Sequence, residues 1–174
     1  MNRTRTVTRE RWIFKSVPRT WRSRRLGADD RDLIEAFFVG MSRTTAREYF
    51  LGGVRPGRRH FAWIDELEGD DRIAVGAFDT HTGVLFGLAQ CARDPGDRTL
   101  AEVAIAVTDT WQRRGLGTRL AGELARFAGS GGITSLSGTT FADNAGVRRL
   151  ANKVGRPRFR HVGAGLVVVE FGAT

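Results

Sequence analysis

The chain has 174 residues, of which 41% are hydrophobic, and a formal charge of +9. This length suits one domain with a full apolar core, and the composition excludes a chain too polar to fold. No stretch approaches the ~20 apolar residues of a membrane-spanning helix, so we expect a soluble protein that does not enter a membrane. No signal-peptide pattern follows the basic N-terminus, and Cys91, the single cysteine, cannot form an internal disulfide. Both features predict a cytoplasmic location.

The positive charge is concentrated at the N-terminus. Residues 1–27 hold eight Arg and one Lys against one acid, which gives +8 and leaves +1 for the remaining chain. We expect residues 1–26 to form a basic arm, partly strand at RWIFKSV (11–17) and partly flexible, and residues 27–174 to form a single domain. Such an arm attracts anionic partners, including nucleic acid, but a solvated arm without a dedicated partner explains it equally well. Nothing in the predicted domain supports nucleic-acid binding.

Two helices are predicted after the arm. Apolar residues follow one helical stripe in residues 28–42, where Asp29 or Asp30 is available as the N-terminal cap. Residues 42–53 begin with Ser and end with Gly, as helices prefer. Residues 54–60 are predicted to form a loop, and residues 60–71 an exposed acidic loop. As an alternative, Phe61 and Trp63 in that segment flank a cleft for a cationic acceptor.

A run of strands follows. Residues 72–79, 84–92 and 100–107 predict three consecutive antiparallel strands. A helix over residues 115–128 then leads to a strand over residues 133–140, and this strand–helix–strand unit predicts a parallel pair. A last helix follows Asp143 or Asn144, and residues 158–162 and 166–171 form a closing hairpin. The fold class is therefore α/β with a mixed sheet.

The turn QRRGLGT at residues 112–118 joins a predicted strand to a predicted helix. Backbone N–H groups at the start of a helix bind phosphate, and Gly115 and Gly117 let a ligand approach them closely. Gln112, Arg113 and Arg114 can add donors and charge. The turn is neither a dinucleotide fingerprint, because Leu120 replaces the third glycine, nor a Walker loop, which requires a lysine.

These residues resemble a known family. The segment AVTDTWQRRGLGTRL is similar to the acyl-CoA-binding motif of the GNAT (GCN5-related N-acetyltransferase) superfamily, and ADN after the next strand agrees. With ADNAGVRRLANKVG, the segment LAEVAIAVTDTWQRRGLGT resembles the domains of bacterial protein-lysine acetyltransferases. The resemblance implies a mixed, mostly antiparallel sheet of six to seven strands, flanked by about four helices.

The resemblance also implies a cosubstrate, acetyl-CoA, and the residues that hold it. Backbone groups of Ile105, Ala106 and Val107 would pair with the pantetheine arm as an added strand. Asn144 would contact the pantetheine or the sulfur end, although it serves equally well as a helix cap. The pyrophosphate would be held by the loop, which comprises Gln112, Arg113, Arg114, Gly115, Leu116, Gly117 and Thr118.

Glu102 is the predicted general base. A free lysine amine has a pKa near 10.4, so only about one in two thousand molecules is neutral at pH 7 and a base is useful. On its strand Glu102 shares a face with Leu100, Ala104 and Ala106, and apolar neighbours favour a raised pKa. The resemblance implies the same role. The alternative is a strand-end carboxylate paired with an arginine.

The usual general acid is absent from this sequence. Many members of the superfamily have a tyrosine in the last helix, but the matching position holds Ala151, and the only tyrosine is Tyr49 in the early helical region. Because an ordinary thiol has a pKa near 8.5, its anion is a tolerable leaving group. The protonation step therefore stays unassigned, and water can serve.

The sequence as a whole predicts an acetyl-CoA-dependent N-acetyltransferase that acts on a primary amine, with protein lysine favoured by resemblance. A small-molecule amine acceptor and a non-catalytic acyl-CoA-binding module are the alternatives. No histidine or cysteine cluster has metal-ligand spacing, so no metal site is expected. Cys91 is expected in the core, and the chain is a monomer or a homodimer.

Overall fold

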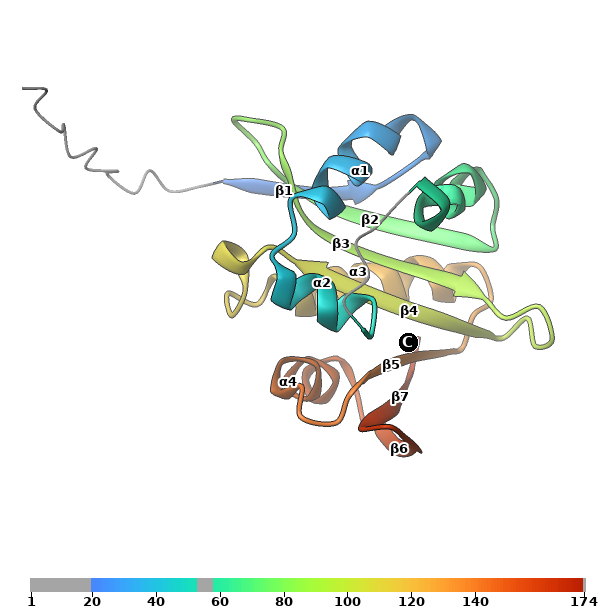
Figure 1. The fold of residues 1–174 in the computed structure, drawn as a ribbon. Helices are drawn as coiled ribbons and strands as arrows, with labels where there is room; N and C mark the ends of the chain where they lie inside the picture. The colour runs from blue at the N-terminus through green and yellow to red at the C-terminus, as the bar shows by residue number, and fades with distance from the viewer. Residues whose placement is uncertain (1–19, 53–57, 174) are drawn as a thin grey trace, which may run out of the picture.

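The computed structural model describes residues 20–52 and 58–173. Short 3-10 helices are labelled η, and Figure 1 shows how the elements are arranged. In chain order the elements are β1 (Trp21–Arg25), η1 (Ala28–Asp30), α1 (Arg31–Val39), α2 (Arg43–Tyr49), η2 (Arg58–Glu68), β2 (Arg72–Asp79), β3 (Leu85–Arg93), β4 (Leu100–Val107), η3 (Asp109–Trp111), α3 (Leu116–Ser130), β5 (Ser135–Phe141), α4 (Ala145–Val154), β6 (Arg158–Gly163) and β7 (Leu166–Gly172).

The strands form one seven-stranded sheet in the order β1-β2-β3-β4-β5-β7-β6. Every neighbouring pair is antiparallel except β4 and β5, which run parallel. This confirms the predicted α/β class, the three consecutive antiparallel strands, the parallel pair and the closing hairpin.

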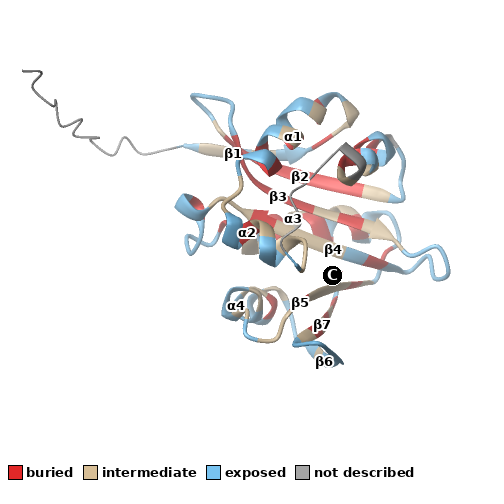
Figure 2. Cartoon of the chain, in the orientation of Figure 1, coloured by how far each residue is buried: buried red, intermediate tan, exposed pale blue. Residues whose placement is uncertain are grey.

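Each face of the sheet carries its own apolar core (Figures 1 and 2). On one face, Leu120 and Leu124 of α3 are fully buried against residues of the strands and of α4. On the other face, Phe38 of α1 and Ile64 of η2 belong to a second buried cluster. Both faces of the central strands β2 and β3 are therefore covered, and Cys91 lies in the first core at 1% exposure, as expected.

Residues 58–68 form the 3-10 helix η2, so the prediction of a loop was wrong here, although the acidic side chains of Asp65 and Glu66 are exposed as expected. Phe61, Ile64 and Leu67 are buried. Their spacing of three residues matches the three residues per turn of a 3-10 helix, which places them on one face. Trp63 packs against the same core rather than flanking a cleft.

The sheet extends into the segment predicted as the basic arm, because β1 pairs with β2 from Trp21 to Arg25. Residues 11–17, the predicted strand, lie outside the described part of the chain. Ser42 caps α2 as predicted, since its hydroxyl accepts a hydrogen bond from the N–H of Thr45. Asp30 does not cap α1; its carboxylate instead accepts the Gly27 N–H, at 3.0 Å.

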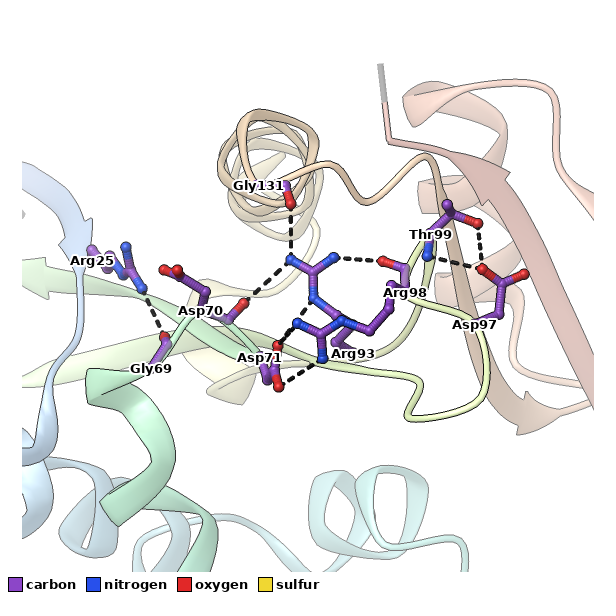
Figure 3. A network of polar contacts seen from close by, with 9 residues as sticks. All are labelled: Arg25, Gly69, Asp70, Asp71, Arg93, Asp97, Arg98, Thr99 and Gly131. Atoms are coloured by element: carbon purple, nitrogen blue, oxygen red, sulfur yellow. Dashed lines mark hydrogen bonds and ion pairs between the residues drawn. The ribbon is translucent and has the colours of Figure 1, made fainter.

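A polar cluster around Arg93 fastens the loop between β3 and β4 to its surroundings (Figure 3). The guanidinium donates hydrogen bonds to the carbonyl oxygens of Arg98, at 2.5 Å, and Gly131, at 2.9 Å. Its Nε lies 3.2 Å from a carboxylate oxygen of Asp71 in an ion pair, and its side chain is only 5% exposed. This one side chain thus links β3, the start of β2 and the end of α3.

Within the described residues, none of the helices is long and apolar enough to cross a bilayer. The same residues contain no cluster of three or more His, Cys, Asp or Glu side chains placed to hold a metal ion.

Candidate active site

The parallel strands β4 and β5 part after three residue pairs (Figure 1). Pairing stops at Glu102 and Ser137, while β4 stays paired with β3 and β5 with β7. Gly138 lies where the strands part, and a Cβ there would come within 2.9 Å of the Val103 carbonyl oxygen. Beyond this point lies a cleft of about 950 Å³, lined by residues of α2, β4, β5, α3 and α4.

The edge of β4 that faces the cleft carries unpaired backbone groups. Thr108 donates its N–H to Phe86, and since the bonded residues of an antiparallel pair alternate, Ala106 and Ala104 also bond to β3. Ile105 therefore directs its N–H and C=O into the cleft. An edge of this kind can pair with an extended, amide-containing chain. The prediction for Ala106 needs correction, because its backbone faces β3 and only its side chain can line the cleft.

The predicted turn lies at one end of the cleft, at the start of the 15-residue helix α3. No hydrogen bond joins the backbone N–H groups of residues 113–118 to a carbonyl oxygen within the described residues. Arg113 and Gly115 have positive φ angles of 58° and 82°, which turn the backbone into the helix. Unpaired N–H groups at the start of a helix and the helix dipole favour a bound anion such as a diphosphate.

Not every side chain of the predicted turn is available to a ligand in the cleft. Gln112 fixes the turn instead of offering its donors to a ligand, because its Nε2 donates to Thr45, at 3.1 Å, and to the Val107 carbonyl, at 3.0 Å. Arg114 lies over the ring of Trp111, with 5.4 Å between guanidinium carbon and ring centroid. The side chain of Leu116 is buried in the core, so only its backbone N–H can contribute to ligand binding at the turn.

The helix α4 closes the other side of the cleft. The side-chain oxygen of Asn144 accepts the N–H of Val147 at 3.0 Å, which confirms the predicted cap. Asn144 also lines the cleft, so its side-chain NH₂ group remains available to a ligand. Ala151 of α4 lines the cleft as well, at the position where the superfamily resemblance implies a tyrosine.

Glu102 lies at the point where the strands part and lines the cleft. Its cross-strand neighbours on the same face are the small residues Ala92 and Ser137. The carboxylate is exposed as a result, although apolar residues share its face of the strand, as predicted. Within the described residues Glu102 forms no ion pair, which also argues against the alternative of a carboxylate paired with an arginine.

Residues of α2 also line the cleft, and the sequence did not single them out as site residues. These are Thr45, Arg47, Glu48 and Tyr49. The hydroxyl oxygen of Tyr49 accepts a hydrogen bond from Nε2 of Gln90, at 2.5 Å. Burial raises the pKa of this phenol well above its ordinary value, although the Gln90 bond opposes the rise. The sequence feature that could have indicated this contact is Gln90, the one glutamine in the apolar strand VLFGLAQC.

The cleft fits acetyl-CoA in two respects. The unpaired amides of residues 113–118 suit its diphosphate, and the unpaired edge of β4 at Ile105 suits the amides of its pantetheine arm. Glu102 lies on the same strand as Ile105 and is further than Ile105 from the turn.

Comparison with known proteins agrees with this geometry. The profile of the Acetyltransferase (GNAT) family matches residues 38–155. The chain is 26% identical over 117 residues to Acetyltransferase Pat from Mycolicibacterium smegmatis. The aligned region covers 67% of this chain and 35% of that protein. The chain thus spans about a third of the length of this curated relative.

Solved structures share the fold. The GNAT domain of S. lividans PAT has a TM-score of 0.77 at 22% identity, covering 87% of this chain and 90% of that one. A GNAT superfamily phosphinothricin acetyltransferase from Sinorhizobium meliloti, solved in complex with AcCoA, has a TM-score of 0.71 at 16% identity and covers 88% of each chain. The family match, together with this shared fold, confirms the resemblance drawn from the sequence, and the chain belongs to the GNAT family of acetyltransferases.

Proposed function

We propose that this protein uses acetyl-CoA to acetylate a primary amine, and that the acceptor is a protein lysine. The observation that carries this is the single cleft in which the free amides of α3, the open edge of β4 and the exposed Glu102 follow one another. The lysine acceptor rests on the resemblance of residues 100–118 and 142–155 to bacterial protein-lysine acetyltransferase domains.

In this proposal Glu102 accepts a proton from the acceptor ammonium, directly or through one water molecule. Its exposure suits the task, because the acceptor must reach it from solvent. Acetyl-CoA supplies a thioester whose carbonyl carbon the neutral amine attacks, so that a C–N bond forms and the C–S bond breaks. Asn144 and the edge of β4 hold the arm, and the amides of residues 113–118 hold the diphosphate.

The departing sulfur leaves as a thiolate. Ala151 offers no proton at the place in α4 where a tyrosine would stand. Since a thiol has a pKa near 8.5, solvent can protonate the thiolate after it leaves. The attacking nitrogen loses two protons in all. Glu102 takes the one whose removal frees the amine, and the second, lost as the intermediate collapses to the amide, passes to solvent, which returns one proton to the thiolate.

The test combines acetyl-CoA titration calorimetry with acetyl transfer to a panel of lysine-rich proteins and peptides. We expect Glu102→Gln to lower kcat by about 10²-fold or more, because it removes the base, while the Kd for acetyl-CoA is unchanged. The matched control is Glu170→Gln, since Glu170 pairs with Ser137 on the same face of the sheet but does not line the cleft. Its turnover should equal that of the wild type.

Other outcomes point to other functions. Binding of acetyl-CoA without turnover on any acceptor supports a non-catalytic acyl-CoA-binding module, an interpretation favoured by Ala151 in place of a tyrosine. Turnover on polyamines or aminoglycosides, and not on proteins, replaces the lysine acceptor with a small-molecule amine. Absence of acetyl-CoA binding at any practical concentration would refute the proposed function altogether.

A further inference from the structure

We propose that Tyr49 is a further catalytic residue, which donates a hydrogen bond to the carbonyl oxygen of the thioester as negative charge develops on it. This inference rests on the proposed function. It deepens that function by assigning a donor on the α2 side of the cleft, where the sequence indicated no site residue.

The register of the sheet places Tyr49 beside the reacting region. Gln90, which holds the phenol, pairs with Ala104 of β4. Ala104 lies two residues beyond Glu102, on the same face and along the edge of the cleft. Because paired residues of neighbouring strands share a face, Gln90 lies on the same side of the sheet as Ala104 and Glu102. Tyr49 lines the cleft together with both of these β4 residues.

The hydroxyl has a proton to donate. Its oxygen already accepts from Gln90 Nε2, at 2.5 Å, and its own proton has no hydrogen-bond acceptor within the described residues. The other end of the same amide, Gln90 Oε1, is buried and also without a partner there. Buried polar groups are rarely left unpaired, because removing them from water without a new partner costs free energy. A pair in this state is suited to complete its bonding with a ligand.

The environment makes the phenol a donor rather than an acid. Burial raises the pKa of Tyr49 above its ordinary value of 10, so the group stays protonated wherever the enzyme works. A thiolate, whose conjugate acid has a pKa near 8.5, would not take a proton from it at equilibrium. A neutral donor aimed at a developing oxyanion stabilises the transition state without transferring its proton.

Tyr49 is also held in place by its neighbours. Its ring centroid lies 5.1 Å from that of Phe38 and 4.9 Å from that of Phe50. Donors that are fixed before the reaction contribute most to such stabilisation, since they need no reorganisation. The same contacts make Tyr49→Phe a clean probe, because the substitution removes the hydroxyl and keeps the packed ring.

The first test needs no acceptor. Infrared spectra of [1-13C]acetyl-CoA bound to the wild type and to Tyr49→Phe report hydrogen bonding to the thioester carbonyl directly. We expect a lower C=O stretching frequency in the wild type, with equal Kd values for the two proteins. Equal frequencies would overturn the inference and leave the proposed function intact, whereas failure of the wild type to bind acetyl-CoA would refute the function itself.

The second test is kinetic. We expect Tyr49→Phe to lower kcat by about 10²-fold, as loss of one oxyanion donor does, with the acceptor KM and the shape of the pH profile unchanged. Thr44→Val is the matched control, since it removes an exposed hydroxyl from the same helix, and it should retain full kcat. An unchanged kcat in Tyr49→Phe contradicts the inference. Loss of the alkaline limb of the pH–rate profile in this variant also contradicts it, because that result would show that Tyr49 transfers its proton as a general acid. Thermal unfolding confirms that both variants are folded.

Discussion

The two ends of the β4–β5 pair differ in how their polar groups are used. At the closed end, defined as residues 100–102 with 135–137, the strands are paired and the Arg93 cluster lies alongside (Figure 3). At the open end, defined as residues 103–107 of β4, the strands have parted and the backbone of Ile105 has no partner strand. Gly138 marks the boundary, because a side chain there would collide with the Val103 carbonyl.

This difference separates stability from acetyl-CoA binding along one strand. Hydrogen bonds made within the closed end stabilise the fold, whereas unpaired groups at the open end cost folding free energy until a ligand pairs with them. A variant at the closed end should therefore change the free energy of unfolding and leave acetyl-CoA affinity intact. A variant at the open end should change the affinity.

The largest expected effect is at Arg93. We expect Arg93→Met to lower the free energy of unfolding by about 3 kcal/mol, because it leaves the carbonyl oxygens of Arg98 and Gly131 without their donor. The acetyl-CoA Kd of the folded variant should stay unchanged. Urea denaturation and titration calorimetry measure the two quantities.

Arg98→Met is the control for that variant. Arg98 pairs with the same carboxylate of Asp71, but both side chains are 61% exposed, and exposed ion pairs contribute less than about 1 kcal/mol. Equal losses in the two variants would show that burial of Arg93 is not what makes the closed end stable. A large loss of acetyl-CoA affinity in Arg93→Met would show that the two ends are coupled.

The same contrast explains what the sequence could predict. The strands and the turn were predictable because alternation, helical stripes and the spacing of Gly115 and Gly117 are local properties. The point where β4 and β5 part was not, since it depends on which strand each edge pairs with. Tyr49 and Gln90 are 41 positions apart, and only the packing of α2 on the sheet brings them together.

Two features that the sequence did not predict also have local causes. The exposed side chain of Glu102 reflects its small cross-strand neighbours, Ala92 and Ser137, which a one-strand pattern does not include. The burial of η2 was missed because its acids suggested a loop, although Phe61 and Ile64 already had 3-10 spacing.

A smaller effect is expected from two glycines at opposite ends of α3. Gly115, which precedes α3 and lines the cleft, and Gly132, just beyond the helix, have φ angles of 82° and 85°, and a Cβ added to either would meet no atom within 4 Å. Alanine at either position should cost roughly 1–2 kcal/mol in backbone strain. We expect Gly115→Ala to raise the acetyl-CoA Kd about tenfold, because relief of that strain moves the amides that hold the diphosphate.

Gly132→Ala provides the matched control, with the same backbone strain and no place in the cleft. It should lower the thermal midpoint and leave the Kd unchanged. If both variants weaken acetyl-CoA binding equally, the loss reflects general destabilisation of α3, and the geometry of the turn is not its cause.

The smallest effect concerns pH and the closed end. A hydrogen bond from Arg98 holds the pKa of Asp71 below its ordinary value of 3.8. A lowered pKa in the folded state means that this carboxylate stabilises the fold above pH 3.8, and that the contribution is lost as the pH falls through the lowered value. Asp71→Asn should therefore be slightly less stable than the wild type at neutral pH, and the difference should vanish in strong acid.

Because the pair is exposed, 1 M salt should also shrink the difference, and acetyl-CoA affinity should not change. Thermal melts of both proteins from pH 7 to pH 2, at low and high salt, measure this difference, and a gap that persists in acid would show that Asp71 acts through its packing and not through its charge.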